Sequence, residues 1–163
     1  DYYAKKFGAE CENMMVVSPD VGSVARARAF AQKLHMNLAI VDKRRQKANS
    51  CEVMNVIGDV RDKDCILFDD MVDTGGSLCN AAQALIEVGG AKSVHACASH
   101  GVLSGPALER VNNSVIQELA LLDTIPAVDP AKCPKIKYLS VAPMFSEAIE
   151  RIYQEISISK LFR

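Results

Sequence analysis

The sequence predicts a doubly wound α/β domain, in which helices flank a mostly parallel sheet. Short β-branched or apolar runs that end in Asp or Ser alternate along the chain with longer segments of helical spacing. Residues 65–68 form a continuously hydrophobic run, CILF, which is typical of a strand covered on both faces and therefore of a parallel sheet. These two observations together favour a repeating strand–helix order.

The elements follow from these patterns in chain order. The segments with the short apolar pattern of strands are residues 14–18, 38–42, 65–69, 93–99, 115–121 and 136–141. The segments with helical spacing are residues 2–8, 21–35, 77–88, 105–111 and 143–156. Residues 43–58 break the rhythm, because polar and basic residues precede a weakly alternating stretch. We expect a small antiparallel flap or a mobile loop there, after the second strand.

Length and composition limit the classes of protein that the chain can belong to. At 163 residues, the chain is expected to form a single domain over positions 1–163. Apolar residues make up 49% and charged residues 24%, which excludes disorder as the default state. A formal charge of -1 gives no support for nucleic-acid binding. The longest uncharged stretch, residues 93–108, is too short and too polar for a membrane span.

The cysteines and the two ends of the chain carry further expectations. The six cysteines have neither zinc-ribbon nor dithiol spacing, so most are predicted to be small core residues in a reducing cytoplasm. The chain begins at Asp1 rather than at Met, which suggests a piece of a longer protein. Met144, Phe145 and Phe162 are expected in the core, because large apolar side chains are usually buried.

The most informative segment is residues 65–78, with the sequence CILFDDMVDTGGSL. Ligands of open α/β sheets bind beyond the carboxyl ends of strands, which places Asp69 and Asp70 at the rim of a pocket. Paired carboxylates accept hydrogen bonds from vicinal hydroxyls or hold a hard divalent cation. Residues 74–77 then offer backbone N–H groups at a helix start, where phosphate binds. A polyol next to a phosphate describes a sugar phosphate.

A structural alternative exists for this segment. Asp, Thr, Gly and Ser are common in turns and helix caps, and an isolated DTGG sequence would favour that interpretation. The preceding buried run and the double Asp make the binding interpretation the stronger one here.

Residues 68–78, FDDMVDTGGSL, resemble the signature of the phosphoribosyltransferase fold family, and most closely that of the ribose-phosphate diphosphokinases, or phosphoribosyl pyrophosphate (PRPP) synthetases. The likeness runs in order over nearly the whole chain and covers the C-terminal half of those enzymes. It implies a type I phosphoribosyltransferase-like fold. The further segments that resemble these enzymes are VVSPDVGSVARAR at 16–28, AIVDKRR at 39–45, HGVLSG at 100–105, EAIERI at 147–152 and SISKLF at 157–162.

The resemblance implies a reaction in which the diphosphate of ATP moves to the anomeric hydroxyl of ribose 5-phosphate, giving PRPP and AMP with Mg²⁺. Asp69 and Asp70 would then face the ribose hydroxyls, and the residues around the 5-phosphate would be Asp73, Thr74, Gly75, Gly76 and Ser77. Asp20 matches the metal-binding aspartate of the family. Family members generally have Gly at the position of Ser23, whose side chain is expected to reduce the space for the ligand.

Lys43 and Arg45 match the catalytic cations on a mobile loop of the family. Positive charge stabilises the oxygens that become more negative during such transfers, and side chains two residues apart face the same way on an extended segment. Without the resemblance, residues 43–47 would be interpreted as a solvated basic loop, and Asp20 as a helix cap.

The resemblance also implies partners. Family members form hexamers that bind regulatory ADP and phosphate between subunits, where Ser157 and Ser159 would contribute. Most of the adenine site comes from N-terminal domains absent from these residues, so the chain alone is expected to bind ribose 5-phosphate with little turnover of ATP. Two alternatives remain open at this stage: a salvage phosphoribosyltransferase, and a non-catalytic, PRPP-binding regulatory partner.

Overall fold

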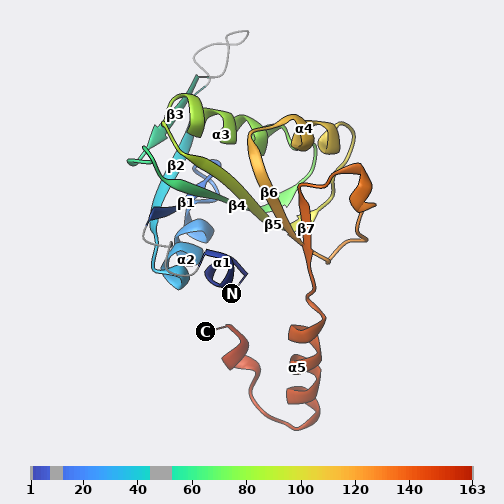
Figure 1. Cartoon of the computed structure of the whole chain (residues 1–163). Helices are drawn as coiled ribbons and strands as arrows, with labels where there is room; N and C mark the ends of the chain where they lie inside the picture. Colours follow the sequence, from blue (N-terminus) through green and yellow to red (C-terminus); the bar gives the residue numbers. More distant parts are fainter. Residues whose placement is uncertain (1, 8–12, 45–52, 163) are drawn as a thin grey trace.

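The computed structural model describes residues 2–7, 13–44 and 53–162, which form a seven-stranded sheet with helices on both faces (Figure 1). The order across the sheet is β3-β2-β1-β4-β5-β6-β7. The strands are β1 (Met14–Ser18), β2 (Asn37–Arg44), β3 (Val53–Ile57), β4 (Asp64–Val72), β5 (Ser93–Gly101), β6 (Ile116–Leu122) and β7 (Ile136–Leu139). The predicted doubly wound, mostly parallel α/β architecture is confirmed.

The sheet reverses its direction of growth between β1 and β4. From β1 the chain proceeds to β2 on one side, and from β4 it proceeds to β5, β6 and β7 on the other. All of these neighbours pair in parallel, whereas β3 pairs antiparallel with β2. Such a switch point leaves a crevice at the carboxyl ends of the two central strands, and open α/β sheets bind their ligands there.

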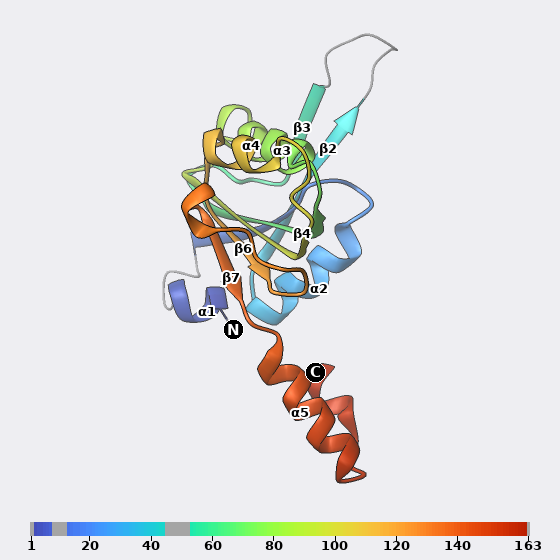
Figure 2. The same cartoon turned by 90° about the vertical axis from the view of Figure 1, so that its right-hand side faces the viewer.

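The helices divide between the two faces of the sheet. Figures 1 and 2 show α3 (Gly76–Glu87) and α4 (Ala107–Asn113) on one face, and α1 (Tyr2–Phe7) and α2 (Val24–Leu34) on the other. The remaining helical elements are the 3₁₀ turn η2 (Pro130–Lys132), α5 (Ala142–Tyr153) and the 3₁₀ turn η3 (Ile158–Phe162). No helix in the described ranges is long and apolar enough to cross a membrane.

Strand β4 shows why its sequence is continuously hydrophobic. Leu67 packs in the cluster that includes Leu85 of α3, whereas Ile66 packs with Tyr3 of α1 on the opposite face. Consecutive strand residues point to opposite faces, and here both faces are covered, so both side chains are fully buried. The central strand is thereby held in place from two sides.

The end of β4 and the pairing of β2 with β3 bear on two sequence predictions. Strand β4 continues to Val72 instead of ending near Asp69, because residues 69, 71 and 72 pair with β5. Asp69 and Asp70 therefore lie within the last part of the strand. Of the antiparallel flap and the mobile loop expected within residues 43–58, the described residues show the flap, as the antiparallel pair of β2 and β3 in which Lys43 pairs with Met54, while residues 45–52 lie outside the described residues.

The expectation of a buried C-terminal segment is wrong. Met144, Phe145 and Phe162 have exposed fractions of 47%, 55% and 69%. Helix α5 and turn η3 bury no residue, and Figures 1 and 2 show them extending away from the sheet. Arg151 forms an ion pair with Glu147 within α5 and donates to the carbonyl of Ser157, which precedes η3. The apolar side chains of this segment are therefore available to a partner.

The cysteines agree with the expectation only in part. Cys65 and Cys133 are buried free thiols, whereas Cys79 and Cys97 are free and partly buried. Burial raises the pKa of the Cys65 thiol to about 12, so this group is protonated and unreactive at neutral pH. Cys11 and Cys51 lie outside the described residues.

His95 of β5 is expected to destabilise the chain in acid. It is 6% exposed, its ring centroid lies 5.0 Å from that of Phe7, and its Nδ1 has no partner among the described residues. Burial, with the charge of Lys6, lowers the pKa of His95, so the unfolded chain takes up a proton that the native chain resists.

His95→Phe should therefore raise the free energy of unfolding by about 1 kcal/mol at pH 7. Its advantage over wild type should grow as the pH falls below about 6.5, the ordinary pKa of histidine. Urea unfolding of both chains at several pH values measures this difference. A constant or shrinking difference toward low pH would contradict the expectation.

Candidate functional site

A cavity of about 530 Å³ lies at the carboxyl ends of β1 and β4, where the sheet reverses. Its walls come from the segment between β1 and α2, from the end of β4 and from the first turn of α3. The lining residues are Asp20, Gly22, Ser23, Arg26, Asp69, Asp70, Met71, Val72, Asp73, Thr74, Gly75, Gly76, Ser77 and Leu78. The structure thus brings together the residues predicted to bind ligand, apart from the basic loop and the tail.

The acidic end of this cavity is organised around Asp69 and Asp70. The Asp70 backbone N–H donates to Asp69 Oδ1 at 2.9 Å, and Arg26 Nη1 of α2 lies 2.9 Å from Asp70 Oδ2. Only Asp70 has an ion-pair partner in the described structure, so the two carboxylates differ in their electrostatic environment.

This difference separates the pKa values of the two groups. Burial, together with the negative charges of Asp70 and Asp20, raises the pKa of Asp69 to about 6. Burial also disfavours ionisation of Asp70, but hydrogen bonding to Asp69 and the charge of Arg26 outweigh it, so the pKa of Asp70 is lowered. The site therefore holds one firmly ionised carboxylate, Asp70. The ionised form of the other, Asp69, would be stabilised by a ligand that donates hydrogen bonds or carries positive charge.

The glycine-rich turn forms the other end of the cavity. Gly75 has φ +73°, a left-handed conformation that favours glycine, and α3 begins at Gly76. Ser104 holds Asp73 in place, since the Ser104 hydroxyl donates to the Asp73 carboxylate and the Ser104 N–H donates to the Asp73 carbonyl. The first turn of a helix offers unpaired N–H groups and the positive end of the helix dipole. The arrangement is suited to an anion such as phosphate.

Asp20 and Ser23 lie between the end of β1 and the start of α2, next to the acidic pair. The Ser23 N–H donates to Asp20 Oδ1 at 2.8 Å, so Asp20 accepts from the start of α2 as the structural interpretation expects. Ser23 is 3% exposed, and its hydroxyl lies 3.5 Å from Asp69 Oδ1. The side chain at this position therefore occupies space next to Asp69.

The remaining predicted site residues do not join the cavity in the described structure. Lys43 belongs to β2, but the structure does not describe its side chain, and Arg45 lies outside the described residues. Ser159 lies in η3 and Ser157 lies just before it, with their hydroxyl oxygens 2.8 Å apart, on the segment that extends away from the sheet (Figure 1).

Sequence reasoning missed Arg26 and Ser104. Arg26 Nη2 donates to Ser23 Oγ at 3.3 Å, an i, i+3 contact for which the helical spacing of this segment was the available signal. The contact of Ser104 with Asp73 joins segments distant in the chain and has no local sequence signal.

Within the described ranges, no group of three or more His, Cys, Asp or Glu side chains forms a cluster that could hold a metal ion. The carboxylate residues that line the cavity are Asp20, Asp69, Asp70 and Asp73. They provide hard oxygen ligands, which suit a cation that keeps several waters and shares the phosphates of a substrate.

Comparison with known proteins assigns the chain to a family. The family model described as "Phosphoribosyl synthetase-associated domain" matches residues 45–163. The chain belongs to this family. Two ribose-phosphate pyrophosphokinases are similar to it: one from Clostridium tetani is 58% identical over 161 residues, and one from Caulobacter vibrioides is 61% identical over 153. These alignments cover 99% and 93% of the chain but 50% and 49% of the relatives. This member of the phosphoribosyl synthetase-associated family thus spans about half the length of its curated relatives.

Solved structures agree with the family assignment. The phosphoribosylpyrophosphate synthetase of Mycobacterium smegmatis superposes with a TM-score of 0.82 at 37% identity, over 94% of this chain and 49% of that one. Orotate phosphoribosyltransferase from Aeropyrum pernix gives a TM-score of 0.56 at 16% identity, over 87% of this chain and 69% of that one. The second likeness shows that the family member shares the phosphoribosyltransferase fold.

Proposed function

We propose that this chain is the ribose 5-phosphate-binding half of a two-domain ribose-phosphate pyrophosphokinase. The whole enzyme would transfer diphosphate from ATP to the C1 hydroxyl of ribose 5-phosphate, giving PRPP and AMP for nucleotide biosynthesis. The single observation that carries the proposal is the meeting of a carboxylate pair and a glycine-rich helix start in one cavity. A sugar phosphate carries hydroxyls and a phosphate at the two ends of one small molecule.

Each end of the ligand would have its own partners. The ribose hydroxyls would donate to Asp69 and Asp70, and a donor to Asp69 would relieve the cost of ionising a buried carboxylate. The 5-phosphate would accept from the backbone N–H groups of residues 74–77 at the start of α3. The opposite orientation would place the phosphate against two carboxylates and is therefore disfavoured.

Mg²⁺ is the proposed cation of this site. The charge of Asp20 contributes to the raised pKa of Asp69, so negative charge accumulates in the cavity and a divalent cation would offset it. Asp20 would hold the ion, with water and substrate oxygens as further ligands. When bound, the ion would neutralise charge that develops on the transferred diphosphate.

The transfer itself would need residues beyond the described cavity. The C1 hydroxyl oxygen would attack the β-phosphorus of ATP, and the bond from that phosphorus to the oxygen of the departing AMP would break. Lys43 and Arg45 are proposed to stabilise the phosphate oxygens during this step. Because the chain spans half the length of its relatives, we propose that adenine binds mostly to the other half.

Assembly and regulation are proposed for the whole enzyme. The exposed apolar residues of α5 and η3 would contact other subunits in a homo-oligomer, which the family resemblance suggests is a hexamer. ADP and phosphate would bind between subunits, near Ser157 and Ser159. The cytoplasm is the proposed location, since the described cysteines are all free.

A chemical-shift titration of the ¹⁵N-labelled chain with ribose 5-phosphate, with and without Mg²⁺, tests the central proposal. We expect shifts concentrated in residues 69–78, and little formation of AMP when ATP is added. A spectrum in which these residues do not respond would refute the proposal. Consumption of PRPP that depends on a nucleobase would favour a salvage phosphoribosyltransferase instead.

A further inference from the structure

The carbonyl groups of the glycine-rich turn are held by a segment that the proposed function does not use. The Leu103 N–H donates to the Val72 carbonyl at 3.0 Å, and the Ser104 N–H donates to the Asp73 carbonyl at 3.0 Å. The next carbonyl, that of Thr74, accepts from Arg110 Nη1 of α4, also at 3.0 Å. Three consecutive carbonyl groups thus accept hydrogen bonds, the first two from backbone N–H groups and the third from a side chain.

These hydrogen bonds determine where the N–H groups of the turn point. A trans peptide group is planar, so its C=O and N–H point in opposite directions. Fixing the Thr74 carbonyl toward Arg110 therefore directs the Gly75 N–H away from Arg110. Thr74, Gly75 and Gly76 line the cavity in which a phosphate is proposed to bind.

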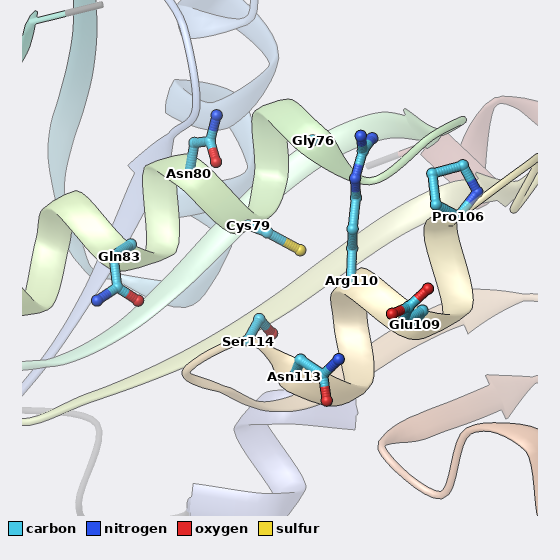
Figure 3. Close-up of a pocket in the computed structure, with 9 residues that line it drawn as sticks. All are labelled: Gly76, Cys79, Asn80, Gln83, Pro106, Glu109, Arg110, Asn113 and Ser114. Carbon is cyan, nitrogen blue, oxygen red and sulfur yellow. The ribbon is translucent and has the colours of Figure 1, made fainter. Parts of the chain in front are cut away.

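Arg110 itself lies on the other side of the turn. It lines a separate groove of about 510 Å³ between α3 and α4, and Figure 3 shows its side chain rising from α4 toward the start of α3. A Cβ atom added to Gly76 would lie 3.3 Å from Arg110 Nη1, so the guanidinium packs directly behind the turn. Gly76 lines both hollows and separates them.

We propose that Arg110 is a positioning residue, which orients the Thr74–Gly75 peptide so that its N–H faces the phosphate end of the cavity. The identity of the ligand rests on the proposed function, whereas the orientation of the peptide does not. A guanidinium suits this place because it is planar, always charged and rich in donors, so a carbonyl bonded to it is held in a defined direction.

The charge of Arg110 adds a second effect. An exposed cation behind the turn makes the electrostatic potential at the N-terminus of α3 more positive. This favours an anion on the other side of Gly76. Because Arg110 is exposed, its replacement should leave the fold intact.

The experiment compares Arg110→Met, which has a similar length and no donor, with Arg110→Lys, which keeps a cationic donor. Arg61→Met is the matched control, because Arg61 is exposed and lies before β4. The first measurement is the backbone ¹⁵N order parameter of Gly75 and Gly76 without ligand. We expect it to fall from about 0.85 to below about 0.6 in Arg110→Met, and to stay near the wild-type value in Arg110→Lys and Arg61→Met.

The second measurement is the affinity of the same chains for ribose 5-phosphate. We expect the dissociation constant of Arg110→Met to rise about tenfold, the effect of losing one well-placed hydrogen bond to an anion. Arg110→Lys should fall between wild type and Arg110→Met, and Arg61→Met should match wild type.

The two measurements fail in different ways. Unchanged order parameters in Arg110→Met would overturn the proposal, whatever the affinity. A looser turn with undiminished affinity would overturn the role of Arg110 in ligand binding. A wild-type chain that does not bind ribose 5-phosphate would refute the proposed function, while the order parameters would still decide whether Arg110 orients the peptide.

Discussion

Gly75→Val is expected to abolish most of the binding of ribose 5-phosphate. Gly75 has φ +73°, and a β-branched residue rarely adopts this conformation, so the turn must change its backbone. The Gly75 N–H and the Gly76 N–H, which are both proposed to donate to the phosphate, would then lose their present directions. Losing two hydrogen bonds to a phosphate should weaken binding about 100-fold, measured by calorimetric titration.

Gly90→Val is the matched control for this substitution. Gly90 has φ +71°, and an added Cβ would meet only ordinary contacts there, as at Gly75. Both variants should lose roughly 2 kcal/mol of unfolding free energy, because both force a side chain into the left-handed region. Only Gly75→Val should lose affinity. Equal affinities for the two variants would mean that the turn does not bind the phosphate.

The sequence predicted the parts of the fold that local patterns specify. The central strands carry uninterrupted apolar runs, and their burial on two faces follows from that pattern, as Ile66 and Leu67 illustrate. The glycine-rich turn was predictable too, since Gly75 and Gly76 precede a helical pattern and glycine adopts φ +73° without the steric strain of a side chain.

The remaining features depend on contacts between distant parts of the chain. Strand β4 continues through Asp69 and Asp70 because β5 pairs with it, although acidic residues are poor strand formers. The bond from Arg110 to the Thr74 carbonyl spans 36 residues and has no local signal. The exposure of Phe145 and Phe162 could not be foreseen, because the helical pattern of α5 predicts an apolar face without saying what covers it.

These distant contacts converge on the proposed binding site. Arg26 reaches from α2 to Asp70, Ser104 reaches from the segment after β5 to Asp73, and Arg110 reaches from α4 to Thr74. The local sequence provides the groups proposed to bind ligand, and the neighbouring elements set their directions. Such support from surrounding residues is what holds a binding site in productive geometry.

Asp69→Asn is expected to stabilise the chain while weakening its binding. The pKa of Asp69 is raised to about 6 from an ordinary value of 3.8, so the native state retains a proton that the unfolded state has lost between these pH values. The unfolding free energy of wild type should therefore fall as the pH rises from about 4 to about 6. The asparagine does not titrate, and it should gain about 1 kcal/mol over wild type at pH 7, a value reduced because Asp69 is only half buried.

Asp70→Asn should show the opposite sign, which makes the pair of variants a sharp test. The pKa of Asp70 is lowered, so its ionised form favours the native state, and that contribution is lost as the pH falls through the native pKa. Asp70→Asn should therefore be slightly less stable than wild type at pH 7, and this deficit should disappear in acid. Chemical denaturation at pH 4 and pH 7 measures both differences.

Because Asp69 and Asp70 are both proposed to accept from ribose hydroxyls, both variants should lose affinity for ribose 5-phosphate by about tenfold or more. If Asp69→Asn gains stability without losing affinity, the ionised Asp69 carboxylate has no role in ligand binding.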